Sequence, residues 1–349
     1  MRALWLRFLI LFLSARIREQ NCDLRKAIRR DIFCLMTDAL PFKLIYHDRY
    51  DLNLGAHVFP SQKFRLIYEM LLREKLATEE DSLRPEQASD EDILRVHTAD
   101  WVRKLKTGAL TASDVMRLEV PYSPELVEAV WLAAGGTILA GQMALRDGFC
   151  SNLSGGFHHA YPEHGEGFCA IHDVAVAIRK LQADDAIKKA IVVDTDVHHG
   201  NGTAAIFRSD PTVFTLSIHQ LNNYPGHKPP SNIDLNMDDR VEDEEYLGTL
   251  IPAVQHALDT FRPEILFYLG GADPYCEDQL GGLSLTKEGL KTRDRCVFEE
   301  ARRRAIPVAT TLAGGYARLV EDTVRIHLNT ILAAREVARA FPSASAARS

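Results

Sequence analysis

Four short apolar runs, separated by longer amphipathic stretches, constrain the fold of this chain more than any other feature. The runs are rich in β-branched and aromatic residues and cover residues 190–193, 212–216, 265–269 and 306–312. Runs without a polar face are typical of parallel strands buried on both faces. The intervening stretches have helical patterning, as in 243–261 and in 286–304, which opens on Thr286 as an N-cap. This alternation predicts an α/β fold: a single three-layer domain with a central, mostly parallel β-sheet flanked by helices.

Residues with catalytic or metal-binding chemistry follow each predicted strand. The segments that follow the four runs are 194–202, 217–219, 270–274 and 313–316, and they supply Asp, His, Tyr and Gly-rich turns. A single Asp after a strand is usually a helix cap, and a single Gly-Gly is usually a turn. Ligands of open α/β sheets, however, bind beyond the carboxyl ends of the strands. Four such strand ends together predict an active site at that edge of the sheet.

Asp196, His198 and Asp273 form the candidate metal centre. Residues two apart in an extended segment point to the same side, so Asp196 and His198 are expected to face one ion. Asp273 arrives from another strand as the third ligand. One His with two carboxylates suits a catalytic divalent ion, most often Zn²⁺, while a metal-free Asp/His cluster is the alternative for the first motif alone. Asp194 is interpreted as a residue that orients a histidine through its ring N–H.

Two adjacent histidines and a tyrosine supply the candidate proton chemistry. His158 and His159 follow two glycines, and neighbouring imidazoles can accept a proton from water and donate one to a leaving group near pH 7. A pair of loop histidines without a catalytic role is the alternative. Tyr316 lies in a Gly-rich turn, where its hydroxyl is suited to stabilising a developing oxyanion.

Together these residues resemble the histone deacetylase family, whose members have the arginase/deacetylase fold. The resemblance runs from about Tyr46 to about Ala317. It rests on five motifs: Gly-Gly-Phe-His-His-Ala, Gly-Phe-Cys, Asp-x-Asp-Val-His-His-Gly-Asn-Gly-Thr, Gly-Gly-Ala-Asp-Pro and Ala-Gly-Gly-Tyr. Residues 57–60 and the polar segment 222–235, with its Tyr-Pro and Asp-Leu, look most like the class IV and bacterial branch.

The resemblance implies a role for each residue of the predicted site. Zn²⁺ would be bound by Asp196, His198 and Asp273. His158 and His159 look like the paired general acid and base, with Asp194 behind His158. Asn201 stands behind His159, where the family has Asp or Asn; because an Asn carries no charge, it should raise the basicity of His159 less than an Asp would.

The resemblance also implies a tunnel, an oxyanion stabiliser and a second ion. Tyr316 looks like the transition-state tyrosine. The Gly167 carbonyl and the Phe168 ring would line the tunnel for the acyl-lysine stem, and Lys63 stands where other branches carry Arg below the zinc. A monovalent cation, K⁺, would be bound near the zinc, mostly through backbone oxygens, at the positions of Asp194, Asp196, His198 and Ser217.

The implied reaction is zinc-dependent hydrolysis of acetyl- or other acyl-lysine in proteins or peptides. Small acetylated amines, such as acetylpolyamines, are the alternative substrates. A non-catalytic acyl-lysine-binding protein is an alternative from another class. Two-manganese ureohydrolases of the same fold need a further Asp two residues before Asp273, where this chain has Gly271.

Composition limits the partners and the compartment. With 41 Lys or Arg against 48 Asp or Glu, the formal net charge of −7 does not favour direct nucleic-acid binding. The six cysteines form no Cys-x-x-Cys pair, so neither a cysteine-rich zinc site nor a disulfide framework is indicated, and a reducing, cytoplasmic location is expected. The apolar run 8–13 is too short for a membrane span.

The ends of the chain differ from its middle. Residues 1–35 contain eight Lys or Arg and three Asp or Glu and are interpreted as a basic, apolar N-terminal extension, with Met36 as the hypothetical true start. The catalytic domain is expected over 42–340. Residues 341–349 are small and polar and are expected to form a flexible tail.

Overall fold

The computed structural model describes residues 40–342. The predicted extension 1–35, Met36 as a start and all but the first two residues of the predicted tail lie outside the described residues, so those interpretations and the exact domain boundaries stay predictions.

The described chain is built on an eight-stranded sheet, with the strand order β2-β1-β3-β8-β7-β4-β5-β6. All pairings between neighbouring strands are parallel. The predicted α/β class is therefore confirmed, and the carboxyl ends of the strands meet at one edge. The strands are β1 Lys43–Ile45, β2 Ser82–Leu83, β3 Phe149–Asn152, β4 Ala190–Asp194, β5 Val213–Gln220, β6 Ile233–Met237, β7 Ile265–Leu269 and β8 Val308–Thr311.

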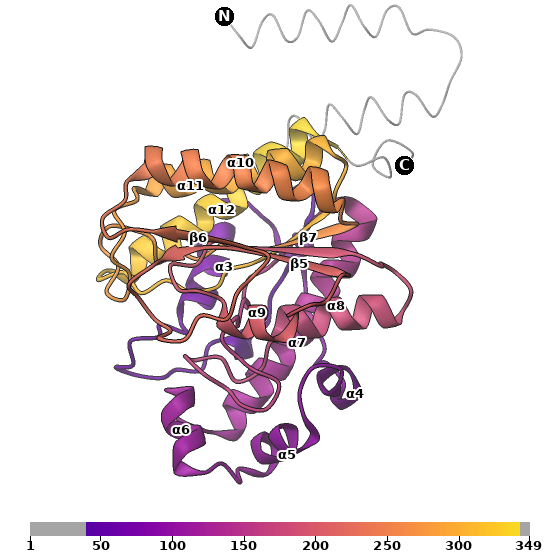
Figure 1. The fold of residues 1–349 in the computed structure, drawn as a ribbon, viewed down its shortest axis with the longest axis vertical. Helices are drawn as coiled ribbons and strands as arrows, with labels where there is room; N and C mark the ends of the chain where they lie inside the picture. The colour runs from indigo at the N-terminus through magenta and orange to yellow at the C-terminus, as the bar shows by residue number, and fades with distance from the viewer. Residues whose placement is uncertain (1–39, 343–349) are drawn as a thin grey trace, which may run out of the picture.

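Helices cover both faces of the sheet and complete the predicted three layers (Figure 1). Helices α3, α10, α11 and α12 pack on one face, and α7 and α8 pack on the other, with α4, α5 and α6 beyond them. The helices are α3 Lys63–Arg73, α4 Asp90–Leu94, α5 Ala99–Thr107, α6 Ala112–Leu118, α7 Pro124–Asp147, α8 Asp173–Ala183, α9 Asn201–Ile206, α10 Asp243–Phe261, α11 Lys287–Arg303 and α12 Val320–Ala340, with short 3₁₀ turns η1 Asp48–Tyr50 and η2 Glu79–Asp81.

Strands β4 and β7 in the centre of the sheet are apolar along almost their whole length because their two faces serve two cores at once. Successive side chains of a strand point to opposite faces. In β4, Ile191 and Val193 join the core under α10–α12, whereas Val192 joins the core under α7 and α8. All five residues of β4 and of β7 are buried. Burial on both faces explains why these runs could be recognised from sequence alone.

The structure differs from the expectations drawn from sequence in strand β5 and in strands that were not predicted, among them β2, β3 and β6. Ser217, Ile218 and His219 were expected to follow the second strand, but they lie inside β5, which continues to Gln220. Strand β3 was not predicted, because it carries polar residues in a buried position. Its Ser151 hydroxyl shares a 2.6 Å hydrogen bond with the Thr310 hydroxyl of β8, so the polar group is satisfied across the sheet.

Helix α7 is the one helix in 40–342 that is long and apolar enough to cross a membrane by length and composition, but 67% of its apolar window is buried inside the fold. It behaves as a core helix, and its Gly135 allows another segment to pass close by. A Cβ on Gly135 would lie 1.9 Å from the Glu86 carbonyl oxygen. The helix therefore needs a residue without a side chain at this crossing.

Candidate active site

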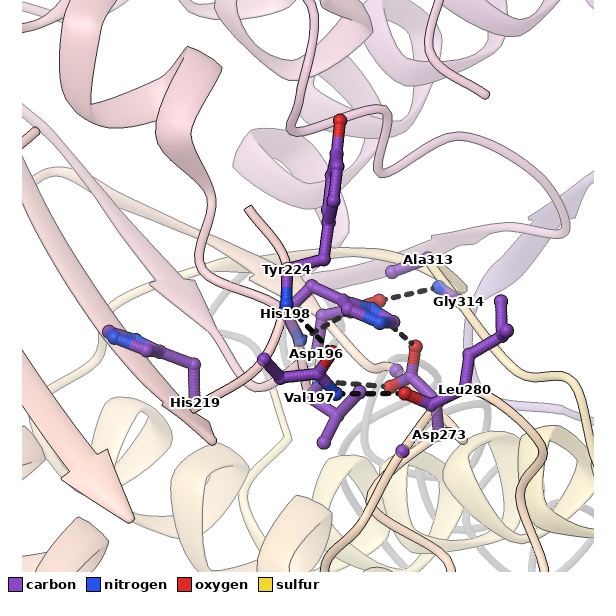
Figure 2. A network of polar contacts seen from close by, with 12 residues as sticks. Asp196, Val197, His198, His219, Tyr224, Asp273, Leu280, Ala313 and Gly314 are labelled. Atoms are coloured by element: carbon purple, nitrogen blue, oxygen red, sulfur yellow. Dashed lines mark hydrogen bonds and ion pairs between the residues drawn. The ribbon is translucent and has the colours of Figure 1, made fainter. Parts of the chain in front are cut away.

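The loops after β4 and β7 bring the three predicted metal ligands together. The two strands are neighbours, and Asp194 at the end of β4 pairs in register with Leu269 at the end of β7. Asp196, His198 and Asp273 are buried, and each offers one ligand atom within 4.8 Å of the others (Figure 2). Side chains that the sequence separates by 75 residues thus converge at the predicted edge of the sheet.

A turn, not the predicted extended spacing, produces this convergence. Strand β4 ends at Asp194, and residues 196–198 form a bend. The carboxylate of Asp196 accepts a 3.0 Å hydrogen bond from the His198 backbone N–H, which closes the turn locally, as Asp side chains commonly do. The expectation that Asp196 and His198 lie on one side was correct in outcome, but its stated reason, strand geometry, was wrong.

The cluster concentrates negative charge in a buried place. Burial and the neighbouring Asp196 raise the pKa of Asp273 to about 7. Burial also opposes ionisation of Asp196, but His158 and His198 outweigh it and hold the pKa of Asp196 well below its usual range. The Asp273 Oδ2 atom is buried and accepts no hydrogen bond, although His198 Nδ1 lies 3.5 Å from it as an ion-pair partner. Two buried carboxylates and an imidazole with such an open acceptor are a donor set that suits Zn²⁺.

Gly314, after β8, closes one side of this cluster. Its N–H donates a 2.7 Å hydrogen bond to Asp196 Oδ2, as Figure 2 shows. A Cβ at this position would lie 2.0 Å from Asp273 Oδ2 and 2.5 Å from Asp196 Oδ2. A side chain here would enter the space between the carboxylates, which supports the assignment of that space to an ion.

The two catalytic-candidate histidines have opposite electrostatic surroundings. Their ring centroids are 4.0 Å apart. His158 Nδ1 donates to Asp194 Oδ2 at 2.7 Å, and although burial lowers its pKa, Asp194 and Asp196 raise it to about 9. His159 Nδ1 lies 2.7 Å from Asn201 Oδ1, and burial together with His158 lowers its pKa well below the usual value. A charged and a neutral imidazole side by side provide one proton donor and one acceptor.

Tyr316 lies beside the cluster, and its ring makes T-shaped contacts with the rings of His198 and Phe168, with centroids 6.3 and 5.8 Å apart. Its backbone N–H donates to Asp278 Oδ2 at 2.7 Å, which fixes the turn after β8. Burial, with Asp196 and other carboxylates adding to it, raises the pKa of Tyr316 well above its usual value. The hydroxyl therefore keeps its proton and can donate a hydrogen bond.

Gly167 and Phe168, which were predicted to line the tunnel, lie next to these residues. Both have positive φ, +50° and +68°. A Cβ on Gly167 would lie 2.8 Å from the His159 ring, so glycine is needed there. The Phe168 ring packs against His57 and Phe59, with centroids 5.4 and 5.9 Å away.

Two neighbours of the site had only a slight signal in the sequence. The ring of Tyr224 stands edge-on to His159, with centroids 5.0 Å apart, and Figure 2 shows its hydroxyl end pointing away from the metal cluster. Lys63 is buried, its Nζ donates to the Ala313 carbonyl at 2.6 Å, and burial lowers its pKa to about 8. A Tyr-Pro turn and a branch-specific Lys were the only cues to them.

The proposed monovalent-cation positions are also near one another. Ser217 of β5 pairs in register with Asp194, and its hydroxyl lies 2.9 Å from His219 Nδ1. The K⁺ assignment stays a prediction. Beside it lies a second cluster that sequence reasoning did not find, made of His199, His219 and Asp234. His199 Nε2 and Asp234 Oδ1 are 3.2 Å apart, so a hydrogen bond ties edge strand β6 to the catalytic loop.

Comparison with known proteins gives one consistent result. The family profile described as histone deacetylase domain matches residues 57–331. A protein of Picosynechococcus sp., described as uncharacterized, is 37% identical over 297 residues, which are 85% of this chain and 99% of that protein. Histone deacetylase 2 of Arabidopsis thaliana is 31% identical, over 80% of this chain and 77% of its own. The crystal structure of the HDA15 HD domain matches in fold with a TM-score of 0.71 at 22% identity, covering 89% of this chain and 91% of that one.

Proposed function

The chain belongs to the histone deacetylase family, and from this premise we propose that it is a zinc-dependent hydrolase that removes acetyl or longer acyl groups from protein lysine side chains. The family supports a deacetylase. The observation that carries the zinc-dependent mechanism is the buried cluster of Asp196, His198 and Asp273 beside a charged and a neutral histidine.

Asp196, His198 and Asp273 are the residues that would hold Zn²⁺. When bound there, the ion supplies positive charge that polarises an amide carbonyl and acidifies water. The buried Asp pair, the Asp273 Oδ2 atom that accepts no hydrogen bond, and the glycine at 314 all support this assignment. Potassium as a second, structural cation remains part of the proposal for the positions of Asp194, Asp196, His198 and Ser217.

The proton steps are assigned to the chain's own side chains. His159, neutral in its buried surroundings, takes a proton from the attacking water at Nε2, while Asn201 holds its other nitrogen. His158, kept charged by Asp194, is the neighbouring proton donor for the leaving amine. The Tyr316 hydroxyl donates a hydrogen bond to the oxygen on which negative charge develops.

Deacetylation of small acetylated amines is the second candidate, because carboxylates lie near the predicted tunnel. The backbone of Gly167 and Phe168 hydrogen-bonds to Arg117 and Leu118, which brings Glu119 beside them. Burial and the nearby Glu166 raise the pKa of Glu119. A negative rim would favour cationic acetylpolyamines over a neutral peptide.

A matched substrate panel tests the proposal. The zinc-loaded protein is given acetyl-lysine peptide, longer acyl-lysine peptides and acetylpolyamines, beside the variants His159→Ala and Tyr316→Phe. We expect turnover of acyl-lysine peptide that is lost in His159→Ala and strongly reduced in Tyr316→Phe. Turnover of acetylpolyamines alone would select the second candidate. Absence of turnover with one zinc bound per chain would overturn both and favour a non-catalytic acyl-lysine-binding protein.

A further inference from the structure

We propose that Glu166 is a positioning residue that fixes the orientation of the Asn201 amide and, through it, the tautomer of His159. The inference rests on the proposed function in one respect, the role of His159 as proton acceptor. No property of Glu166 beyond its position before Gly167 was evident from the sequence.

Three side chains from two separate segments form a continuous hydrogen-bonded row. His159 Nδ1 and Asn201 Oδ1 are 2.7 Å apart, and Asn201 Nδ2 donates to Glu166 Oε1, also at 2.7 Å. His159 and Asn201 are buried, with 5% and 1% of their surface exposed, whereas the Glu166 side chain is 19% exposed. The row therefore runs from the catalytic interior towards the surface and ends on a carboxylate.

An asparagine behind a catalytic histidine can hydrogen-bond to it in two orientations, whereas an aspartate can bind it in only one way. An Asp carboxylate only accepts, so the imidazole nitrogen facing it must carry the proton. An Asn carboxamide can present either its oxygen or its NH₂ group to that nitrogen. If the NH₂ group faced His159 Nδ1, the neutral ring would carry its proton on Nε2 and could not accept one there.

Glu166 removes this ambiguity because it is an acceptor. Burial raises the pKa of Glu166, but hydrogen bonds from His164 and Asn201 outweigh it and keep the pKa below the usual value. The His164 Nε2 atom lies 3.3 Å from Glu166 Oε2. Only the NH₂ group of Asn201 can face an ionised carboxylate favourably. In the flipped amide, Asn201 Oδ1 would face the Glu166 carboxylate, and both of these groups only accept hydrogen bonds.

The other groups around this row do not fix the amide. The Tyr161 hydroxyl, which also interacts with Asn201, can donate or accept and so accommodates either orientation. The Tyr224 hydroxyl hydrogen-bonds to Glu166 and leaves its charge in place. Glu166, on the far side of Asn201 from His159, thus fixes the orientation of the Asn201 amide, which Asn201 cannot fix itself.

The functional test compares the effect of Glu166→Ala in two backgrounds. With Asn201 present, we expect Glu166→Ala to lower kcat roughly 10- to 100-fold, the usual range for residues that orient site groups. In the Asn201→Asp background the carboxylate fixes the tautomer directly, so the same change should leave kcat close to that of Asn201→Asp. Glu163→Ala, an exposed acid of the same loop whose side chain contacts His164 and not Asn201, is the matched control and should not alter kcat.

A spectroscopic test does not depend on turnover. In ¹⁵N NMR of the zinc-loaded full chain, with His159 assigned by comparison with His159→Ala, we expect the Nδ1–H tautomer in the wild type and a mixture in Glu166→Ala. An unchanged tautomer in Glu166→Ala, or equal losses of kcat in both Asn201 backgrounds, would overturn the proposal. If no substrate were turned over, the proposed function would fail while the tautomer result would still decide the role of Glu166.

Discussion

At the scale of single residues, chemical capacity depends on surroundings that lie far apart in the sequence. Tyr316 is an ordinary phenol in an unfolded chain, but burial beside carboxylates raises its pKa and keeps its proton in place. His158 and His159 are adjacent in sequence, yet, despite burial, the carboxylate of Asp194 raises the pKa of His158, whereas His159 faces the uncharged Asn201 and has its pKa lowered by burial and by His158. Each residue therefore acts through a partner that another segment supplies.

Removing the Tyr316 hydroxyl should lower activity without disturbing the fold. We expect Tyr316→Phe to reduce kcat by roughly 10²- to 10³-fold, the range for loss of one oxyanion donor, because the ring contacts with Phe168 and His198 remain. Steady-state kinetics, with zinc content and the unfolding midpoint as controls, would measure this. Unchanged kcat in a folded, zinc-loaded variant would contradict the role given to Tyr316.

The positions of the site residues could be predicted, but the contacts between them only partly. Asp196, His198, Asp273 and Tyr316 stand in contiguous motifs whose residue types already limit the chemistry. The proposed role of Glu166, in contrast, depends on a hydrogen bond from Asn201, which lies 35 residues away in the sequence. A charged residue in a loop is usually solvated, so nothing in the local pattern marks it as part of the site.

At the scale of elements, helix α7 shows how packing overrides intrinsic helix preference. Gly135 and Gly136 lie in the middle of α7, which runs from Pro124 to Asp147. Glycine is a poor helix former and suggests an end. Here Gly135 permits the close passage of the Glu86 backbone, and Gly136 that of Tyr50, whose hydroxyl would lie 2.3 Å from an added Cβ.

Two glycine substitutions should therefore change the free energy of unfolding in opposite directions. Gly135→Ala should destabilise the protein by about 1–3 kcal/mol, the cost of overpacking, because backbone rather than a flexible side chain blocks the new methyl group. Gly248→Ala in α10, where nothing lies within 4 Å, should stabilise it by up to about 1 kcal/mol. Denaturant unfolding midpoints measure both, and stabilisation by Gly135→Ala would refute the crossing described here.

At the scale of the whole molecule, the edge of the sheet at which the strands end brings together the proposed ion-binding residues. The four central strands could be predicted because burial on both faces gives each of them an apolar, β-branched or aromatic run. The polar strand β3 and the convergence of Asp196 and Asp273 depend on pairing between distant segments, which a local pattern does not contain. The fold thus buries two acids side by side, where His198 and Lys63 supply some positive charge and a bound cation would supply more.

Removing zinc should accordingly lower the stability of the entire fold. Ion at 100 times its dissociation constant stabilises the native state by about 2.7 kcal/mol, so chelation should lower the unfolding midpoint reversibly. In Asp273→Asn the ion should no longer raise the midpoint, and the ion-free variant should be at least as stable as the ion-free wild type because the repulsion with Asp196 is gone. Thermal unfolding with and without chelator measures these differences, and a midpoint insensitive to zinc would argue against the site.

Acid should destabilise the ion-free fold through buried neutral histidines. Burial lowers the pKa of His97 to about 4 from 6.5, and its Nε2 accepts the His172 backbone N–H at 2.9 Å. As the pH falls, the unfolded chain binds a proton at His97 before the folded chain does. The free energy of unfolding is therefore unaffected above pH 6.5 and falls by about 3 kcal/mol as the pH drops towards 4. Urea unfolding in chelator across this range should show a shallower pH dependence for His97→Gln, and parallel curves would contradict it.

The placement of the ligand loops on β4 and β7 has a consequence for motion as well. Both strands are wholly buried in the middle of the sheet, whereas most of β6 at the edge is partly exposed. Amide hydrogens of β4 and β7 should exchange with deuterium only through global opening, while those of β6 exchange through local fluctuations. The strands that carry the proposed ligand loops should therefore be among the slowest parts of the molecule to open, and the geometry of the proposed metal site should persist between the departure of one ion and the arrival of the next.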